Sequence, residues 1–345
     1  MPGSAPLRLL LDGPALIANW RWLAARNPGA TCGAAVKADG YGLGARDVVA
    51  RLAGAGCADF FCATWAEAAA LGALPEGVRL AVLHGVRPED MADAKASPAR
   101  PVLNSVAQVA RWRDAGGGLC DVMVDTGMNR LGLAIEEAMG GALEGLAIDT
   151  LMSHLACADE PGHPLNAVQL AAFRALRERV PAARYSLANS AGILLGGEFA
   201  FDLTRPGIAL YGGVPVPAAT GIAPVAAIEA QVLQVRTARA GETVGYGAIW
   251  TAPADSRIAI LNLGYADGYM RPFARGAFAT ASGRDLPLVG RISMDLIAID
   301  VTGADVGEGD WLRMDFDLPR VSARSGLSQY ELLTGLNLRF ERCWD

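Results

Sequence analysis

The first strand and turn that the sequence predicts read Cys32-Gly33-Ala34-Ala35-Val36-Lys37-Ala38-Asp39-Gly40-Tyr41-Gly42-Leu43-Gly44. This pattern is typical of a short buried strand that ends in a glycine-rich turn. Lys37 is one of only two lysines, with Lys95, among 30 basic residues. Arginine can hold a charge at a strand end, but lysine can also lose its proton and attack a carbonyl when burial lowers its pKa. A lysine that merely extends into solvent is the commoner case, and the scarcity of lysine here favours a chemical role.

Beyond this turn, short apolar runs alternate with amphipathic helical segments from about residue 30 to residue 211. Helices are expected over segments such as 45–55, 105–114 and 167–180, with Ser105 as an N-cap. Strands are expected over residues 31–36, 59–63, 79–84, 101–104, 121–125, 150–155, 184–188 and near 207–211. Eight strands that alternate with helices predict an α/β fold, a TIM-like (β/α)8 barrel. An open doubly wound sheet is the alternative, and it would need fewer strands.

The pattern changes where prolines and glycines gather between residues 214 and 224. Alternating β-branched strands follow, over residues 231–237, 257–263, 286–289 and 296–301, with tight Gly and Asp turns between them. The length of 345 residues also favours two domains. We therefore expect a barrel over residues 1–221 and a mostly antiparallel C-terminal β domain over residues 222–345.

Composition excludes several classes of function. A net charge of −6 is unfavourable for binding nucleic acid. No apolar run is long enough to span a membrane, and the run at residues 7–11 is too short for a signal peptide. The six cysteines lack metal-ligand or redox spacing, which indicates reduced thiols in a cytoplasmic protein. The three histidines also lack ligand spacing, so no metal is expected.

Catalytic groups of a barrel lie where its strands end. Polar groups follow five of the expected strands, at Lys37 and Tyr41, at 125–132, at 153–159, at 189–192 and at 204–208. The turns at 189–191 and 205–208 offer backbone N–H groups and a hydroxyl, as a bound phosphate requires, and barrels often bind phosphate after strands seven and eight. A lysine that can form an imine, facing such a turn, fits pyridoxal 5'-phosphate.

These residues belong to a set of motifs that resembles the alanine racemase family over nearly the whole chain. The motifs are Ala35-Val36-Lys37-Ala38-Asp39-Gly40-Tyr41-Gly42, Asp125-Thr126-Gly127-Met128, Ser153-His154 through Asp159-Glu160, Arg205-Pro206-Gly207-Ile208-Ala209-Leu210-Tyr211-Gly212, Val244-Gly245-Tyr246-Gly247, Gly264-Tyr265-Ala266-Asp267-Gly268-Tyr269 and Gly290-Arg291-Ile292-Ser293-Met294-Asp295. Any one of them is a weak signal, whereas seven in the family's order are specific. The resemblance implies a cytoplasmic homodimer with shared active sites, which interconverts L- and D-alanine and supplies D-alanine for peptidoglycan.

The resemblance also implies two bases. Lys37 would hold the cofactor as an imine and act on one face of the α-carbon, while Tyr246 would act on the other face from the partner subunit. Inverting a stereocentre requires proton removal on one face and delivery on the other, unless a single base moves across. A tyrosine has an ordinary pKa of about 10, so its anion needs stabilisation. The resemblance assigns that role to His154, in contact with Arg205.

Further site residues are carried over in the same way. Arg205 would face the pyridine nitrogen of the cofactor, where a permanent positive charge disfavours protonation and suppresses side reactions. The implied phosphate ligands are Tyr41, Ser190, the backbone of Gly207 and Ile208, and Tyr330. The implied ligands of the substrate carboxylate are Arg130 and the backbone N–H of Met294. The implied entrance-gate residues are Asp159, Tyr265, Arg271 and Arg291.

The chain departs from the family pattern at Met123, where many members have a lysine that supports the arginine equivalent to Arg130. That support must come from elsewhere here. Two alternatives stay open: a racemase of broader specificity or for serine, and a non-catalytic barrel that binds pyridoxal phosphate. Proteins of the second kind resemble the first domain alone, so residues 222–345 count against it.

Overall fold

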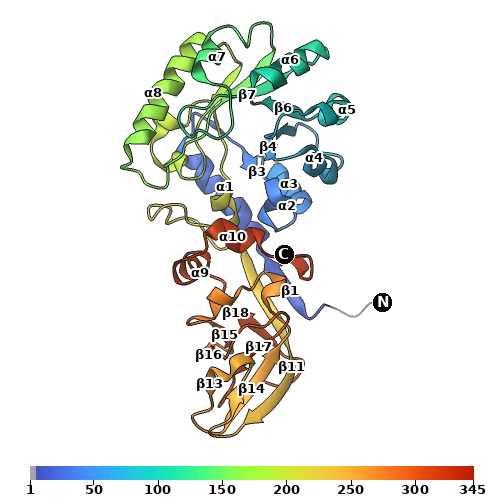
Figure 1. The fold of residues 1–345 in the computed structure, drawn as a ribbon, viewed down its shortest axis with the longest axis vertical. Coiled ribbons are helices and arrows are strands. Elements are labelled where there is room, and N and C mark those ends of the chain that lie inside the picture. Colours follow the sequence, from blue (N-terminus) through green and yellow to red (C-terminus); the bar gives the residue numbers. More distant parts are fainter. Residues whose placement is uncertain (1–4) are drawn as a thin grey trace. The chain divides into compact units, whose positions relative to one another are not determined.

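The computed structural model of the protein describes residues 5–345, which form two compact units (Figure 1). One unit is Leu16–Ala223, and the other is Pro224–Asp345 together with the N-terminal segment up to Ala15. Strand β1 (Leu7–Leu11) pairs with β11 (Ala226–Ala238) and with β19 (Glu341–Trp344), which places it in the second unit's sheet. The sequence pattern grouped residues 1–15 with the barrel, and the first four of these lie outside the described residues.

The unit Leu16–Ala223 contains a parallel sheet of seven strands. In order these are β3 (Ala34–Ala35), β4 (Asp59–Cys62), β5 (Arg79–Val82), β6 (Arg100–Leu103), β7 (Cys120–Met123), β8 (Ile148–Met152) and β9 (Arg184–Ser186). An eighth strand, β10 (Leu203–Thr204), pairs with β2 (Thr31–Cys32), which directly precedes β3.

Backbone hydrogen bonds on both sides of β10 close the ring. The N–H of Asp202 donates to the carbonyl of Tyr185 at 3.0 Å, and the N–H of Arg205 donates to the carbonyl of Ala188 at 2.9 Å. On the other side, the N–H of Gly33 donates to the carbonyl of Thr204 at 2.9 Å. The predicted (β/α)8 barrel is therefore confirmed.

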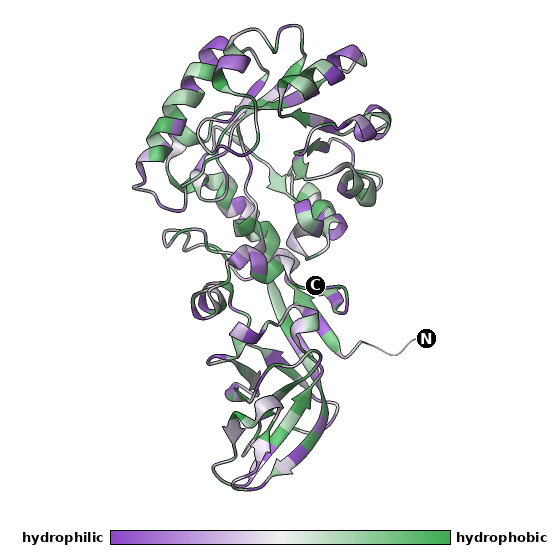
Figure 2. Ribbon diagram, viewed as in Figure 1, coloured by the Kyte–Doolittle hydropathy of each residue, from purple (hydrophilic) through white to green (hydrophobic). Residues whose placement is uncertain are grey.

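The helices of this unit follow the expected alternation. They are α1 (Gly13–Arg26), which begins before the unit does, α2 (Lys37–Tyr41), α3 (Ala45–Gly54), α4 (Trp65–Leu71), α5 (Met91–Ala96), α6 (Val106–Asp114), α7 (Ile135–Met139) and α8 (Pro164–Arg179). Ser105 caps α6 as predicted, because its hydroxyl accepts a hydrogen bond from the N–H of Gln108. Figure 2 shows both hydrophobic and hydrophilic residues along helices such as α8, as expected when one face covers the sheet.

The position of the eighth strand differs from the prediction. Residues 207–211 were expected as a strand, but Ile208–Tyr211 forms a buried 3-10 helix, and the strand is Leu203–Thr204. Pro206 follows that strand and has no N–H for a sheet ladder. The N–H of Gly207 donates to the Ser190 hydroxyl instead. The carbonyl of Pro206 still accepts from the N–H of Ala35 at 2.9 Å, so the backbone leaves the sheet after Pro206.

Charged side chains meet at the N-terminal ends of the barrel strands. They come from six consecutive strands, β4 to β9, and are Asp59, Arg79, Arg100, Asp121, Asp149 and Arg184. Arg184 contacts Asp59 at 2.9 Å and Asp149 at 2.6 Å. Arg100 contacts Asp149 at 3.0 Å and Asp121 at 3.3 Å. Ion pairs thus link neighbouring and non-neighbouring strands at this end of the barrel.

The second unit is built on an eight-stranded sheet. Besides β1, β11 and β19, its strands are β14 (Ser256–Leu261), β15 (Phe278–Ala281), β16 (Arg284–Val289), β17 (Ile297–Asp300) and β18 (Trp311–Met314). All pairs except β1 with β19 are antiparallel, so the predicted β domain is confirmed.

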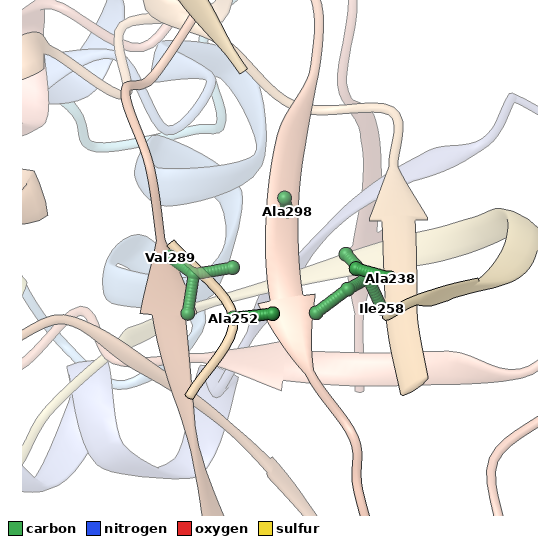
Figure 3. Packing of buried hydrophobic residues seen from close by; sticks show 5 residues of the cluster. All are labelled: Ala238, Ala252, Ile258, Val289 and Ala298. Carbon is green, nitrogen blue, oxygen red and sulfur yellow. The ribbon is translucent and has the colours of Figure 1, made fainter. Parts of the chain in front are cut away.

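Smaller elements complete this unit: the hairpin β12 (Thr243–Val244) and β13 (Trp250–Thr251), and the helices α9 (Leu318–Ser325) and α10 (Gln329–Thr334). Figure 3 shows part of its core, where Ala238, Ala252, Ile258, Val289 and Ala298 pack together. Within residues 5–345, none of the helices combines the length and the apolar character needed to cross a membrane.

Candidate active site

Lys37 follows β3 and opens a turn with an unusual backbone. Ala38, Asp39, Gly40 and Tyr41 all have positive φ, with values of 53°, 52°, 62° and 57°. Three of these residues are not glycine, and left-handed backbone costs such a residue roughly 1–2 kcal/mol. The surrounding structure must therefore hold this turn in place, and with it the position of Lys37.

The Lys37 side chain is exposed at the C-terminal end of the barrel, so the expectation of a buried lysine is wrong. Protein atoms around the amine still remove enough water to lower its pKa, and this desolvation is the largest influence. The positive charge of Arg130 lowers the pKa further, while Glu67 raises it. The net effect is a lowered pKa, which increases the fraction of the neutral amine, the form that attacks carbonyls.

The expected phosphate ligands of the barrel lie together. The Ser190 hydroxyl oxygen accepts hydrogen bonds from the N–H of Gly207 at 2.8 Å and of Ala209 at 3.3 Å. A Cβ on Gly207 would lie 2.1 Å from the Tyr41 hydroxyl, so only glycine allows this approach. The Tyr41 ring stacks on Tyr211, with ring centroids 4.6 Å apart.

Tyr211 connects this cluster to the Lys37 strand, since its hydroxyl donates to the carbonyl of Ala35 at 2.8 Å. Ile208 begins the short helix after Gly207 and is buried. Next to Ser190, the side-chain oxygen of Asn189 accepts a hydrogen bond from the N–H of Gly192. A hydroxyl, a closely approached glycine and a reactive amine on adjoining strand ends fit pyridoxal phosphate.

Arg205 is buried where β10 ends. Its guanidinium donates to the Ser186 hydroxyl and, at 2.5 Å, to the carbonyl of Ser153. Burial lowers its pKa to about 10, which leaves the group charged at neutral pH. The structure thus presents a permanent cation inside the barrel end.

His154 follows β8 and lies near three cations. Desolvation lowers its pKa to about 3, and the charges of Arg205, Arg130 and Lys37 act in the same direction. The imidazole is therefore neutral at physiological pH. The described hydrogen bonds of Arg205 go to Ser186 and Ser153, so the expected contact between His154 and Arg205 is electrostatic.

Gln169 holds the His154 segment and is not among the residues that the sequence predicts for the site. This fully buried residue of α8 donates to the carbonyl of His154 at 2.9 Å and to the Thr126 hydroxyl at 3.2 Å. Its side-chain oxygen accepts from the N–H of Ala156 at 2.9 Å. Thr126 and Ser153 in turn share a hydrogen bond of 2.7 Å. The only sequence signal was an amide next to the apolar face of the helix.

Arg130 is supported through its backbone. The Asp125 carboxylate accepts hydrogen bonds from the N–H groups of Gly127, Met128 and Arg130, each at 2.8 Å. Met123 is buried in β7, and its thioether cannot replace a charged partner. The Arg130 side chain is exposed, as is Asp159 in the segment after β8.

The other expected site residues belong to the second unit. Tyr246 lies in the segment between β12 and β13 with 73% of its surface exposed, unlike a packed strand tyrosine. It lines a pocket of about 290 Å³ with Arg291, Val244 and Leu296.

In this unit, a backbone hydrogen bond joins Met294 to the segment that contains Tyr265. The N–H of Ala266 donates to the carbonyl of Met294 at 2.9 Å, and the Arg271 guanidinium lies 5.1 Å from the centre of the Tyr265 ring. Met294 and Tyr330 are both about half exposed, at 54% and 49%. The expected site residues are therefore divided between the two units.

Comparison with known proteins agrees with both units. Residues 11–215 match the model of the alanine racemase N-terminal domain, and residues 225–344 match that of the alanine racemase C-terminal domain. The chain belongs to the alanine racemase family. This confirms the resemblance seen in the sequence motifs.

Individual relatives cover almost the whole chain. An alanine racemase of Acidiphilium cryptum is 44% identical over 97% of each chain, and one of Rhodospirillum rubrum is 45% identical over 97% of this chain and 94% of that relative. The solved structure of an alanine racemase from Bartonella henselae, with covalently bound pyridoxal phosphate, aligns with a TM-score of 0.90. It is 36% identical and covers all of both chains.

Proposed function

We propose that this protein interconverts L- and D-alanine with pyridoxal 5'-phosphate as its cofactor. The reaction class and the cofactor are those of the family to which the chain belongs. The observation that carries the proposal is the Lys37 amine of lowered pKa, which follows a barrel strand at the same end of the barrel as the Ser190 and Gly207 turn.

Lys37 would bind the cofactor through its aldehyde, and the Lys37 amine would exchange a proton with one face of the substrate α-carbon. Bound pyridoxal phosphate withdraws electrons from that carbon and so acidifies its hydrogen. Tyr41, Ser190, Tyr330 and the backbone of Gly207 and Ile208 hold the phosphate. The close approach of Tyr41 to Gly207 supports this assignment.

Arg205 would lie against the ring nitrogen of the cofactor and disfavour its protonation, because two adjacent positive charges repel. Support comes from its burial between Ser186 and Ser153, which fixes the guanidinium, and from a pKa of about 10. A decarboxylase on a related barrel would have a carboxylate in this place.

Tyr246 is the second base and acts across a homodimer interface on the opposite face of the α-carbon. Its high exposure in its own unit supports a role toward another subunit. The neutral imidazole of His154 is a hydrogen-bond donor for the phenolate, and the nearby Arg205 charge favours that anion.

Substrate alanine is held through its carboxylate by Arg130 and the backbone N–H of Met294. Met294 and Tyr330 leave room for little more than a methyl group, and Asp159, Tyr265, Arg271 and Arg291 form the entrance. We also propose a cytoplasmic location and a role in supplying D-alanine for peptidoglycan. The six cysteines, all of them free thiols, support the location.

The test is racemisation by the purified protein. Each L-amino acid is incubated with wild type and with Tyr246→Phe, and the loss of optical activity is followed. Wild type should act fastest on alanine, and Tyr246→Phe should lose most of that activity. A wild-type protein that binds the cofactor but inverts no amino acid would refute the proposal, and faster racemisation of serine would favour the broader-specificity alternative.

The shared site has its own experiment. Lys37→Ala and Tyr246→Phe subunits, each expected to lose most of the activity alone, are mixed. Hybrid dimers hold one intact site if Tyr246 acts across the interface, so activity should return. No recovery, with subunit exchange confirmed by mass spectrometry, would place Tyr246 in the site of its own subunit.

A further inference from the structure

Glu67 connects two strand ends at the base of the Lys37 turn. One oxygen of its carboxylate accepts a hydrogen bond from the N–H of Ala38 at 2.9 Å, and the other accepts from the N–H of Ala63 at 2.6 Å. Ala38 is the residue after Lys37, and Ala63 directly follows β4. The carboxylate therefore ties the turn after β3 to the neighbouring strand.

This use of Glu67 differs from what its local sequence predicts. The order Thr64-Trp65-Ala66-Glu67 has the form of a capping box, in which the glutamate would bond to the N-cap N–H. The Thr64 hydroxyl does accept from the N–H of Glu67, at 3.2 Å. The described bonds of the carboxylate, however, go to Ala63 and to Ala38 of a separate segment.

Polar contacts hold the turn beside a pocket. A pocket of about 250 Å³ is lined by Val36, Asp39, Cys62 and Glu67. At the other end of the turn, the Asp39 carboxylate accepts from the N–H of Ala45 at 2.9 Å. Hydrogen bonds to carboxylates thus hold both ends of the left-handed segment.

We propose that Glu67 is a positioning residue, which fixes the Lys37 turn in its left-handed conformation and so sets where the Lys37 amine lies. The inference rests on the proposed role of Lys37 as the amine that binds the cofactor. Glu67 acts through the backbone of Ala38 and needs no contact with cofactor or substrate.

The negative charge of Glu67 gives this role a measurable signature. It raises the pKa of Lys37, against the effects of desolvation and Arg130. Removing the charge should therefore shift the Lys37 titration to lower pH. A residue that merely stabilised the fold would leave the titration unchanged.

The experiment compares Glu67→Gln and Glu67→Ala with Glu137→Gln. Glu137 is a matched control, because its carboxylate also accepts a backbone bond near a helix start, from Ala134 at 2.9 Å. The full chain is labelled with [13Cε]lysine and freed of cofactor, and its two lysine signals are assigned with Lys95→Arg. Each signal is titrated by NMR, and pyridoxal phosphate affinity is measured by absorbance.

Glu67→Gln should lower the Lys37 pKa relative to wild type, and Glu67→Ala should also weaken pyridoxal phosphate binding by about tenfold or more, the usual effect of losing a charge-assisted bond. Glu137→Gln should change neither. If both Glu67 variants match the control, or only lose thermal stability, the inference is wrong. If Glu67→Ala does not fold, the pyridoxal phosphate affinity of Glu67→Gln decides, because the single side-chain oxygen of glutamine cannot reproduce both backbone hydrogen bonds.

Failure of this inference is distinguishable from failure of the proposed function. Lys37→Arg is measured in the same absorbance titration, and it should give no signal of covalently bound cofactor. If Lys37→Arg binds like wild type, the proposed role of Lys37 is wrong whatever Glu67 does. If the Glu67 variants behave like Glu137→Gln while Lys37→Arg loses the signal of covalently bound cofactor, the proposed role of Lys37 stands and that of Glu67 is wrong.

Discussion

The Ser190 hydroxyl accepts a hydrogen bond from the N–H of Gly207 at 2.8 Å, which joins the chain after the seventh barrel strand to the turn after the eighth. Tyr41 completes this arrangement, because its hydroxyl occupies the space that a side chain on Gly207 would need. Residues far apart in sequence thus form one compact polar cluster beside the Lys37 strand.

Gly207→Ala should weaken cofactor binding by at least about tenfold, since the new Cβ would lie 2.1 Å from the Tyr41 hydroxyl and displace it. Absorbance titration with pyridoxal phosphate measures this. Gly54→Ala is the control, because a Cβ at that helix end meets no atom within 4 Å. Equal pyridoxal phosphate affinities for the two variants would show that the close contact between the Tyr41 hydroxyl and Gly207 does not contribute to cofactor binding.

His154 should not titrate between pH 5 and 8. Its pKa is about 3 in the folded protein, below an unfolded value of about 6.5, so folding favours the neutral ring. The contribution of His154 to the free energy of unfolding is fully present above pH 6.5, and it decreases as the pH falls toward 3. Imidazole NMR signals test this, with His154→Gln assigning the resonance, and a midpoint near 6.5 would contradict the account.

Asp121 has the opposite pH dependence. Burial raises its pKa to about 6, against the effect of Arg100, and one carboxylate oxygen has no hydrogen-bond partner among the described residues. Since the folded pKa exceeds the unfolded one, this group adds stability as pH falls from 7 to 5, by about 1 kcal/mol. Urea unfolding at both values should show this gain in wild type relative to Asp121→Asn. An equal pH response in the two proteins would disprove it.

Gln169→Leu should cost about 1–3 kcal/mol of stability, because the carbonyl of His154 and the N–H of Ala156 lose their partner. The turnover number should also fall, since the His154 segment is no longer fixed. Denaturant unfolding and steady-state kinetics measure the two effects. Gln231→Leu, which removes a bond from an exposed amide, serves as the control. Wild-type kinetics in Gln169→Leu would exclude the positioning effect.

Much of the fold could be predicted because barrel strands are short apolar runs that alternate with amphipathic helices. The eighth strand escaped prediction because Leu203–Thr204 is only two residues long and the more apolar segment 207–211 follows it. The place of Leu7–Leu11 could not be read from sequence either. Its partners, β11 and β19, lie more than two hundred residues away.

The candidate site residues were predicted from motifs, whereas the residues that support them were not. Glu67, Gln169 and Asp121 act through side-chain contacts between separate elements, and no local pattern specifies such contacts. The exposure of Lys37 was missed for a related reason. A strand pattern predicts burial of the strand itself, here Ala34–Ala35, but not of the first side chain beyond its end.

The identity of the lysine that binds the cofactor is the most direct test. Holoenzyme is treated with borohydride, which fixes an imine as a stable amine, and the modified peptide is identified by mass spectrometry. The account predicts the pyridoxyl group on Lys37 alone, and no modification in Lys37→Arg. A pyridoxyl group on Lys95, or on any other residue while Lys37 remains unmodified, would contradict the account.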